Sequence, residues 1–261
     1  MKYCMVLKYD GTGINGWQSQ KNALAIQDIL EGAVFRITGE KKRVVGASRT
    51  DSGVHAVAQV ATFNLKEERE CADLQYKLNA VLPPAISVRK LFLIEDSFRP
   101  QKDAINKTYK YFILNSRIRN PFIERYSWHI PYPLNRDNMR EAARQLVGVH
   151  NFAAFQNSGT DQRTTIRNIQ SIDIQEIGDI IGFTITAEGF LKQMVRNIIS
   201  NVIDVARGRR EVSHIKLLLE SRDRRNGGKT APPQGLFLWN IRYLNWESGE
   251  KSDVIFSTIE I

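Results

Sequence analysis

Hydrophobic and polar positions alternate along several stretches of the chain and recur at helical spacing along others. Short alternating runs predict half-buried strands, and apolar residues three and four positions apart predict amphipathic helices. On this basis we predict strands at 2–9, 43–47, 56–63, 86–94, 107–114, 164–177, 180–188 and 236–244. We predict helices at 25–37, 71–82, 135–147, 190–206 and 212–219.

The order of these elements indicates the fold class. The first part runs strand-helix-strand-strand-helix-strand, which is a ferredoxin-like unit, and the second part has a similar outline. We therefore predict an α+β fold of two ferredoxin-like lobes, with mainly antiparallel sheets that form a central cleft. The predicted parts are an N-terminal lobe, a C-terminal lobe and a tail, at 1–102, 103–245 and 246–261. Alternation over 254–261 hints at an extra strand in the tail.

Composition and cysteine usage limit the class of protein. Hydrophobic residues make up 42% of the chain and charged residues 25%, as is typical of a soluble globular protein. No window holds the roughly 20 apolar residues that a membrane span needs, and the N-terminal apolar run is too short for a signal peptide. The two cysteines, Cys4 and Cys71, favour reduced thiols in a cytoplasmic protein over a disulfide.

The charge balance is basic. The chain has 37 Lys and Arg against 28 Asp and Glu, a net charge of +9. This balance suits a polyanionic partner such as nucleic acid, although a basic protein without such a partner can have it too. Local basic groups at 41–43, 207–210 and 222–229 favour the first interpretation, and each also fits a solvated surface.

A glycine-rich stretch, YDGTGINGW at 9–17, follows the first predicted strand. Its glycines have the spacing of a dinucleotide-binding loop, which requires a helix to begin at once so that its N-terminus meets the pyrophosphate. Here the next helix begins only around residue 24, and no parallel βαβ series follows. The stretch therefore predicts a turn that needs a flexible backbone, and a nicotinamide oxidoreductase is disfavoured.

A second stretch, GASRTDSGVHAVAQVATF at 46–63, places charged side chains in a glycine-flanked loop between two predicted strands. Such a loop can hold a reactive side chain rigidly. No G-x-S-x-G of a hydrolase occurs, so His55 is expected to make a structural hydrogen bond. The spacing of the four histidines matches no common zinc motif, and no metal site is predicted.

Asp51 is the candidate for chemistry in this loop. A loop aspartate alone is usually a turn former, but Arg49 lies two residues before it. Arg196 lies on the polar side of the helix predicted at 190–206. It is either a solvated helix charge or, if it faces Asp51 in a cleft, the cation that keeps this carboxylate ionised.

Tyr109 and Tyr111 alternate along the strand KTYKYFIL and therefore point to one face. An aromatic ring on a strand that faces a cleft can stack on a nucleobase, which stabilises binding by roughly 1–3 kcal/mol per base. The alternative is a core aromatic, which is the expectation for at least one of the pair.

Several segments occur in a recognisable order over nearly the whole chain. They are YDGTGINGWQSQ (9–20), ASRTDSGVHAVAQVATF (47–63), KTYKY (107–111), HNFAAF (150–155), FLKQMVRNII (190–199) and APPQGLFL (231–238). On these segments the sequence resembles the tRNA pseudouridine synthase A family, and R-T-D-x-G-V-H-A alone is highly specific. Ser48 departs from the family, where glycine is common at this place, which leaves loop shape and target preference open.

The resemblance implies a role for four residues. Asp51 matches the nucleophilic aspartate, Arg49 the arginine that takes the place of the flipped base, Tyr109 the ring that packs on the target uracil, and Arg196 the partner of the aspartate. The implied enzyme is an isomerase that converts uridine to pseudouridine at positions 38, 39 and 40, in the anticodon arm of tRNA, without a cofactor. A cytoplasmic homodimer with tRNA as its partner is implied as well.

The alternative is a non-catalytic RNA-binding protein of the same fold. It would share the basic charge and the exposed aromatics. It would have no need of Asp51, because a carboxylate near phosphates otherwise weakens binding.

Overall fold

A computed structural model of the chain describes residues 1–21, 23–159 and 164–249. The strands are β1 (Lys2–Tyr9), β2 (Val45–Gly46), β3 (His55–Asn64), β4 (Ile86–Ile94), β5 (Asn106–Leu114), β6 (Trp128–His129), β7 (Gly148–Asn151), β8 (Ile166–Ile177), β9 (Ile180–Ala187) and β10 (Leu236–Arg242). The helices are α1 (Ile26–Thr38), α2 (Cys71–Val81), α3 (Arg136–Arg144), α4 (Met194–Ala206) and α5 (His214–Ser221). Short 3₁₀ turns are η1 (Glu124–Tyr126), η2 (Ala153–Phe155), η3 (Arg224–Asn226) and η4 (Pro233–Gly235). The strand suggested at 254–261 lies outside the described residues.

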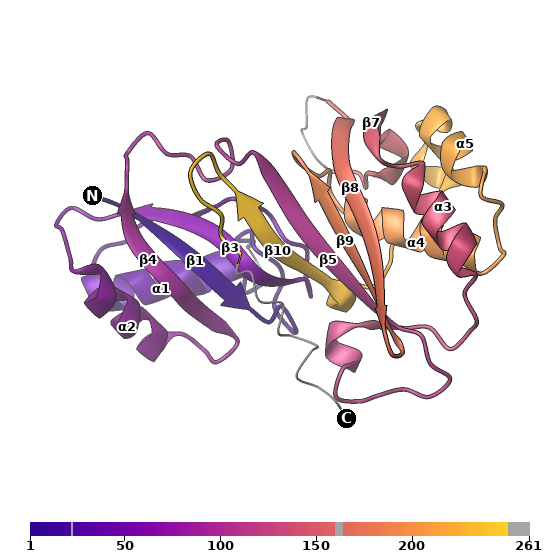
Figure 1. Ribbon diagram of the computed structural model, residues 1–261. Coiled ribbons are helices and arrows are strands. Elements are labelled where there is room, and N and C mark those ends of the chain that lie inside the picture. Colours follow the sequence, from indigo (N-terminus) through magenta and orange to yellow (C-terminus); the bar gives the residue numbers. More distant parts are fainter. Residues whose placement is uncertain (22, 160–163, 250–261) are drawn as a thin grey trace.

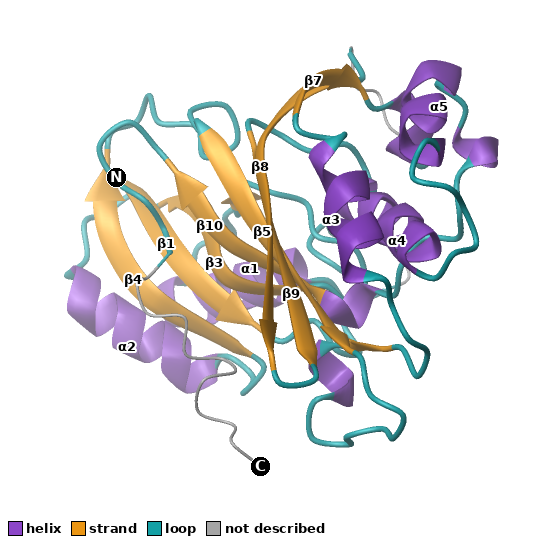
Figure 2. Ribbon diagram, turned by 45° about the vertical axis from the view of Figure 1, so that its right-hand side comes forward, coloured by secondary structure: helices purple, strands orange, loops and turns teal. Residues whose placement is uncertain are grey.

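All these strands belong to one ten-stranded sheet, in the order β4-β1-β3-β10-β5-β9-β8-β7, with β2 beside β3 and β6 beside β5. In Figure 2 the strands form one twisted layer, with α1 and α2 on one half and α3, α4 and α5 on the other. Among the described strands, only the β10–β3 and β5–β6 pairs are parallel. The predicted α+β class with a mainly antiparallel sheet is therefore confirmed.

Strand β10 joins the two halves of the molecule. It runs parallel to β3, where Phe237 is opposite His55, and antiparallel to β5, where Leu238 is opposite Tyr109. Figure 1 shows this C-terminal strand between segments from the two halves of the chain. The expected lobes thus share a continuous sheet, because a strand distant in sequence completes the ladder between them. The division at 102/103 stays a prediction.

Helix α4 begins at Met194, not at Phe190 as its apolar spacing predicted. The reason is Gln193, which adopts a left-handed conformation with φ of 59° and ψ of 12° just before the first turn. Helix α3 begins as expected, because the Asn135 side chain accepts a hydrogen bond of 2.9 Å from the Asn138 backbone N–H. The sharp turn at Gln193 matters for the site, since it sets the direction of the first turn of α4.

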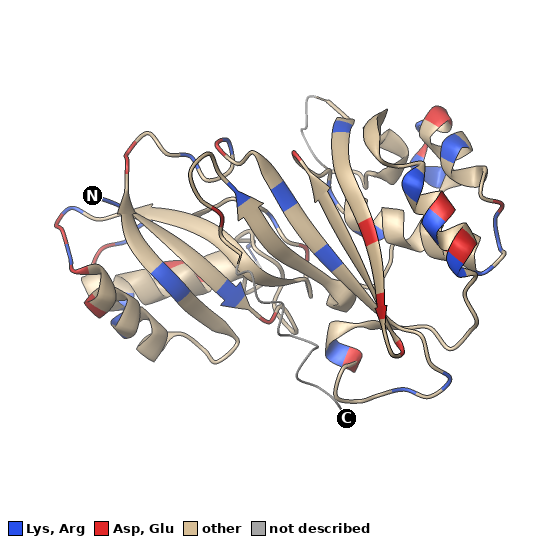
Figure 3. Ribbon diagram, in the orientation of Figure 1, with Lys and Arg blue, Asp and Glu red and all other residues tan. Residues whose placement is uncertain are grey.

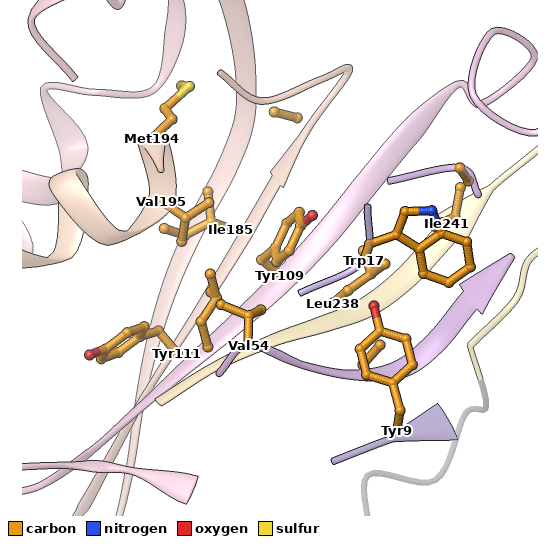
Figure 4. Close-up of a cluster of buried hydrophobic side chains, with 14 of the residues drawn as sticks. Tyr9, Trp17, Val54, Tyr109, Tyr111, Ile185, Met194, Val195, Leu238 and Ile241 are labelled. Carbon is orange, nitrogen blue, oxygen red and sulfur yellow. The ribbon is translucent and has the colours of Figure 1, made fainter. Parts of the chain in front are cut away.

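The main core runs without interruption through both halves. Tyr9 and Trp17 from the N-terminal half, Tyr109 from β5 and Leu238 from β10 belong to one buried cluster (Figure 4). Tyr9, Leu238 and Tyr109 lie on β1, β10 and β5, within the run β1-β3-β10-β5 of the sheet, and Trp17 lies in the segment that follows β1. Burial of this shared apolar surface therefore fixes the relative position of the two halves.

A close contact at Gly46 generates a stability prediction. A Cβ atom on Gly46 would lie 2.4 Å from the indole of Trp17, which is only 2% exposed. Overpacking of this kind costs about 1–3 kcal/mol, so Gly46→Ala should lower the free energy of unfolding by that amount. Urea denaturation followed by circular dichroism measures it.

Gly32 provides the matched control. It lies within α1, and a Cβ atom there would meet no heavy atom within 4 Å. Gly32→Ala should raise the free energy of unfolding by about 0.5–1 kcal/mol, because alanine loses less backbone entropy than glycine on entering a helix. Equal effects from the two substitutions would show that the contact with Trp17 is unimportant.

Candidate active site

Asp51 lies in the turn between β2 and β3. The Val54 N–H donates to the Asp51 carbonyl at 3.1 Å, and Gly53 has a φ of 74°, which closes the turn tightly. Asp51 is partly exposed, with 23% of its side-chain surface accessible. Its carboxylate is therefore held on a rigid turn and can still meet a ligand.

The glycine-rich stretch at 9–17 packs directly against this turn. A Cβ atom on Gly11 would lie 2.1 Å from the Val54 carbonyl oxygen, and one on Gly16 would lie 2.5 Å from that of Thr50. The Trp17 N–H donates to the Thr50 carbonyl at 3.0 Å. Since α1 begins only at Ile26, the structure agrees with a turn and not with a dinucleotide-binding loop. The glycines are needed for backbone contact with the Asp51 turn.

Arg196, in the first turn of α4, reaches the same carboxylate. Its Nη1 donates to Asp51 Oδ2 at 2.9 Å, across 145 residues of sequence, and its Nε donates to the Ala231 carbonyl at 2.7 Å. The Arg196 side chain is only 11% exposed. Of the two sequence-based interpretations, the structure therefore favours a partner of Asp51 over a solvated helix charge.

Tyr109 lies on the other side of the loop. Its hydroxyl is 2.8 Å from Ser48 Oγ, and its ring packs edge-on against Phe190 at 5.0 Å between centroids. Burial raises the pKa of Tyr109 to about 12, helped by the negative charge of Asp51. The Tyr109 phenol is therefore protonated at neutral pH.

Tyr111, by contrast, is a core residue. Its side chain is fully buried, and its hydroxyl donates to the Pro232 carbonyl at 2.8 Å. The expectation that at least one of the two tyrosines belongs to the core is confirmed.

His55 fixes the loop from behind. Its Nδ1 accepts from the Gly11 N–H at 3.0 Å, and its Nε2 lies 3.1 Å from the Gln234 carbonyl and 3.2 Å from that of Arg125. Burial lowers the pKa of His55 and outweighs the opposing charge of Asp10. The structural hydrogen bond expected for His55 is present, and it links three segments around the loop.

Lys107 is a contributor that the sequence-based reasoning missed. Its Nζ donates to the Ala47 carbonyl at 2.6 Å, immediately before Ser48. Burial lowers the pKa of Lys107 to about 8. The available signal was alternation, since Lys107 shares the buried face of β5 with both tyrosines. Two residues of that face, Lys107 and Tyr109, thus hold the start of the Asp51 loop.

Arg49 is exposed, two residues before Asp51. The loop therefore brings Asp51, Arg196 and Tyr109 around one place and leaves the Arg49 guanidinium at the surface. Among the described residues, no three or more His, Cys, Asp or Glu side chains are grouped as a metal site would require. Within the same residues, no helix has the length and apolar character needed to cross a bilayer.

Comparisons with known proteins identify the family of the chain. A family model described as tRNA pseudouridine synthase matches residues 5–94 and 142–244. A tRNA pseudouridine synthase A of Thermoanaerobacter sp. (strain X514) is 44% identical over 239 residues, which cover 92% of this chain and 98% of the relative. One of Pelobacter propionicus is 41% identical over the same shares. Among solved structures, a Cbf5-Nop10-Gar1 complex is similar over 91% of this chain and 49% of that chain, with 12% identity and a TM-score of 0.39.

The fold and the aspartate–arginine site, taken with the family model, define a pseudouridine synthase. More specifically, the chain belongs to the tRNA pseudouridine synthase A family. The resemblance inferred from the sequence motifs is confirmed, and so is the expected enzyme class, an isomerase that acts on tRNA.

The buried ammonium of Lys107 generates a pH prediction. Because the pKa of folded Lys107 is about 8 and that of an ordinary lysine is 10.5, its burial penalty is fully present below pH 8 and is relieved above it. The free energy of unfolding of the parent, minus that of Lys107→Met, should therefore rise as pH increases from about 8 toward 10.5. Urea denaturation at a series of pH values measures this difference.

Lys110→Met is the matched control, since Lys110 lies on the opposite face of β5, over the ring of Trp239. The pH dependence is due to the buried Lys107 only if the free energy of unfolding of Lys110→Met changes with pH as that of the parent does. If Lys107→Met and Lys110→Met showed the same dependence of the free energy of unfolding on pH, Lys107 would not be its source.

Proposed function

We propose that this chain isomerises uridine to pseudouridine at positions 38, 39 and 40, in the anticodon arm of tRNA, with Asp51 as its catalytic carboxylate. The observation that carries the proposal is the contact of 2.9 Å between Arg196 and Asp51, made within a loop whose sequence matches the family motif. The names of the relatives support tRNA as the substrate.

The reaction begins when the target nucleotide leaves its stack, which costs a few kcal/mol. Arg49 would offset part of that cost, because its side chain is exposed in the same loop, two residues before Asp51. A planar guanidinium can stack where a base has left. We therefore assign Arg49 to the gap in the RNA and not to bond breaking.

Asp51 acts at the sugar. Arg196 donates to Oδ2, and among the described residues no hydrogen bond is made to Oδ1, which is left for the ribose. Asp51 either attacks C1′ or takes a proton from C2′, and the C1′–N1 bond breaks in both routes. The uracil then rotates and C5 bonds to C1′. In the first route this step breaks the Asp51–C1′ bond, and in the second route C2′ regains its proton. The proton of C5 is lost while N1 gains one. Atoms and electrons balance without an oxidant, a reductant or a cofactor.

Tyr109 supports the uracil while it is detached from the sugar. Its ring is held by the Ser48 hydroxyl and by Phe190, next to Asp51. Its pKa of about 12 means that the phenolate is scarce at neutral pH, so Tyr109 is poorly suited to remove the C5 proton. We assign it to packing on the base, with Ser48 setting the ring position.

The proposed assembly is a cytoplasmic homodimer in which one tRNA reaches across both subunits. This part rests on family membership alone. The basic groups of the chain would bind phosphates along the RNA and read its shape.

Replacement of the carboxylate tests the proposed chemistry. Asp51→Asn should abolish pseudouridine formation while tRNA binding persists, because the amide retains the shape of the side chain and loses its nucleophilicity and basicity. Mass-spectrometric mapping of pseudouridine in an unmodified tRNA measures activity and position together. Asp137→Asn is the control, since that side chain is 99% exposed on α3. Turnover near the parental rate in Asp51→Asn would exclude Asp51 from the chemistry.

Arg196 can be tested with two graded changes. Arg196→Gln should lower kcat by about 10²-fold, because the carboxylate loses both its charge partner and its orientation. Arg196→Lys should lose less, since an ammonium keeps the charge but cannot bind Asp51 and the Ala231 carbonyl in the same forked geometry. Single-turnover kinetics at saturating tRNA distinguish the two. An unchanged rate in Arg196→Gln would refute its role as the partner of Asp51.

A further inference from the structure

A concave site separate from Asp51 lies in the C-terminal half, where η2, the end of α5 and η3 meet. It has a volume of about 590 Å³ and is lined by residues 153 and 156–159 together with Arg222 and Arg224. We propose that this Arg222–Arg224 pocket binds a backbone phosphate of the RNA whose target uridine is at Asp51. The inference rests on the proposed function and adds to it a defined contact outside the reacting centre.

In the part of the chain that the structure describes, no carboxylate pairs with the arginines of the pocket. Arg224 donates to three neutral oxygens, those of Asn157 at 3.0 Å, Asn197 at 2.9 Å and Thr230 at 3.2 Å. Among the described residues, neither Arg222 nor Arg224 forms an ion pair. The nearby acid, Asp223, is instead bound through both oxygens by Arg225. Asp223 thus neutralises Arg225, which lies outside the pocket. The guanidinium groups of Arg222 and Arg224 remain charged beside the cavity.

Arg222 has an unusual backbone conformation. It ends α5 with φ of 52° and ψ of 16°, in the left-handed region where helices usually place glycine. A non-glycine residue held in this region carries a conformational cost, and such costs persist mostly at functional sites. Glycine would fit this backbone conformation at a lower free-energy cost than arginine. The presence of arginine therefore points to a functional role for its side chain.

The chemistry of the lining selects the ligand. Arginine offers a planar fork of donors that matches a phosphate. Among the described residues, the lining contains no aromatic ring and, apart from Ala153, no apolar side chain. It therefore lacks the surface on which a base would stack, and it fits a phosphodiester better than a free nucleotide.

The pocket is built on the same scaffold as the site at Asp51. Asn197 Oδ1, which accepts from Arg224, also accepts from Thr230 Oγ1 at 2.8 Å. Arg196 precedes Asn197 in the sequence, and Ala231 follows Thr230. The hydrogen bond between Arg196 and the Ala231 carbonyl orients the Arg196 guanidinium toward Asp51. The first turn of α4 and residues 230–231 thus hold both sites. A phosphate bound by Arg224 would therefore lie at a fixed position relative to the nucleotide at Asp51. The contact reads the backbone and carries no base specificity.

Arg222→Gly tests the proposal without endangering the fold, because glycine suits the left-handed conformation. Binding of an unmodified tRNA transcript is titrated over a range of KCl concentrations. The affinity should fall roughly tenfold, as expected for loss of a charge-assisted contact. The slope of log affinity against log salt should shrink by about 0.7–0.9, the value for one released counterion. Arg222→Lys, which restores a cation, should recover most of the slope.

Lys216→Gln is the matched control, because it removes one positive charge from the exposed side of α5, outside the lining of the pocket. It should leave affinity and slope at parental values. Parental binding by Arg222→Gly, or an equal loss in Lys216→Gln, overturns the pocket while leaving the chemistry at Asp51 untouched. A parent protein that does not bind tRNA overturns the proposed function as well, so the two failures are distinguishable.

Discussion

The hydrogen-bonded ion pair between Arg196 and Asp51 is the interaction on which the arrangement of this molecule depends. Its two partners come from opposite halves of the chain and meet only because β10 joins β3 to β5 in one sheet. Two nitrogens of the Arg196 guanidinium are engaged, Nη1 by the carboxylate and Nε by a carbonyl. A partly buried pair of this kind is weak as a source of stability, since desolvation cancels much of the attraction. The contribution of the pair is to orient Asp51, because Arg196 holds Oδ2 and leaves Oδ1 for a ligand.

The rest of the site holds the Asp51 carboxylate in a rigid frame. His55 is buried in its neutral form, and Tyr109 retains its proton. Backbone contacts from the glycine-rich stretch press on one side of the loop, and Lys107 holds its beginning through a carbonyl. Groups that would compete with Asp51 for a proton are thus suppressed by burial, while the turn itself has little freedom to move. This combination is what an electrostatically preorganised site requires.

Local pattern predicted most elements of the fold, because strands such as β1 and β4 carry their signal within a few residues. The predicted start of α4 was too early because the spacing of apolar residues does not reveal the left-handed conformation of Gln193. Periodicity placed Arg196 on a polar face but could not say what covers that face, since Asp51 lies 145 residues away. The position of β10 and the clamp by Lys107 depend on long-range pairing in the same way. Asp51 itself was accessible from the sequence, because its motif is contiguous.

The insertion of β10 between β3 and β5 bears on how the chain is made. During synthesis, every other strand of this sheet leaves the ribosome before β10 does. Until then β3 and β5 each present an open edge, and such edges invite pairing with other chains. The nascent protein therefore cannot unite Asp51 with Arg196 in the complete sheet until β10 has been synthesised. An incomplete chain therefore lacks the proposed catalytic pair, and the open edges of β3 and β5 are most prone to aggregation in the interval before β10 pairs with them.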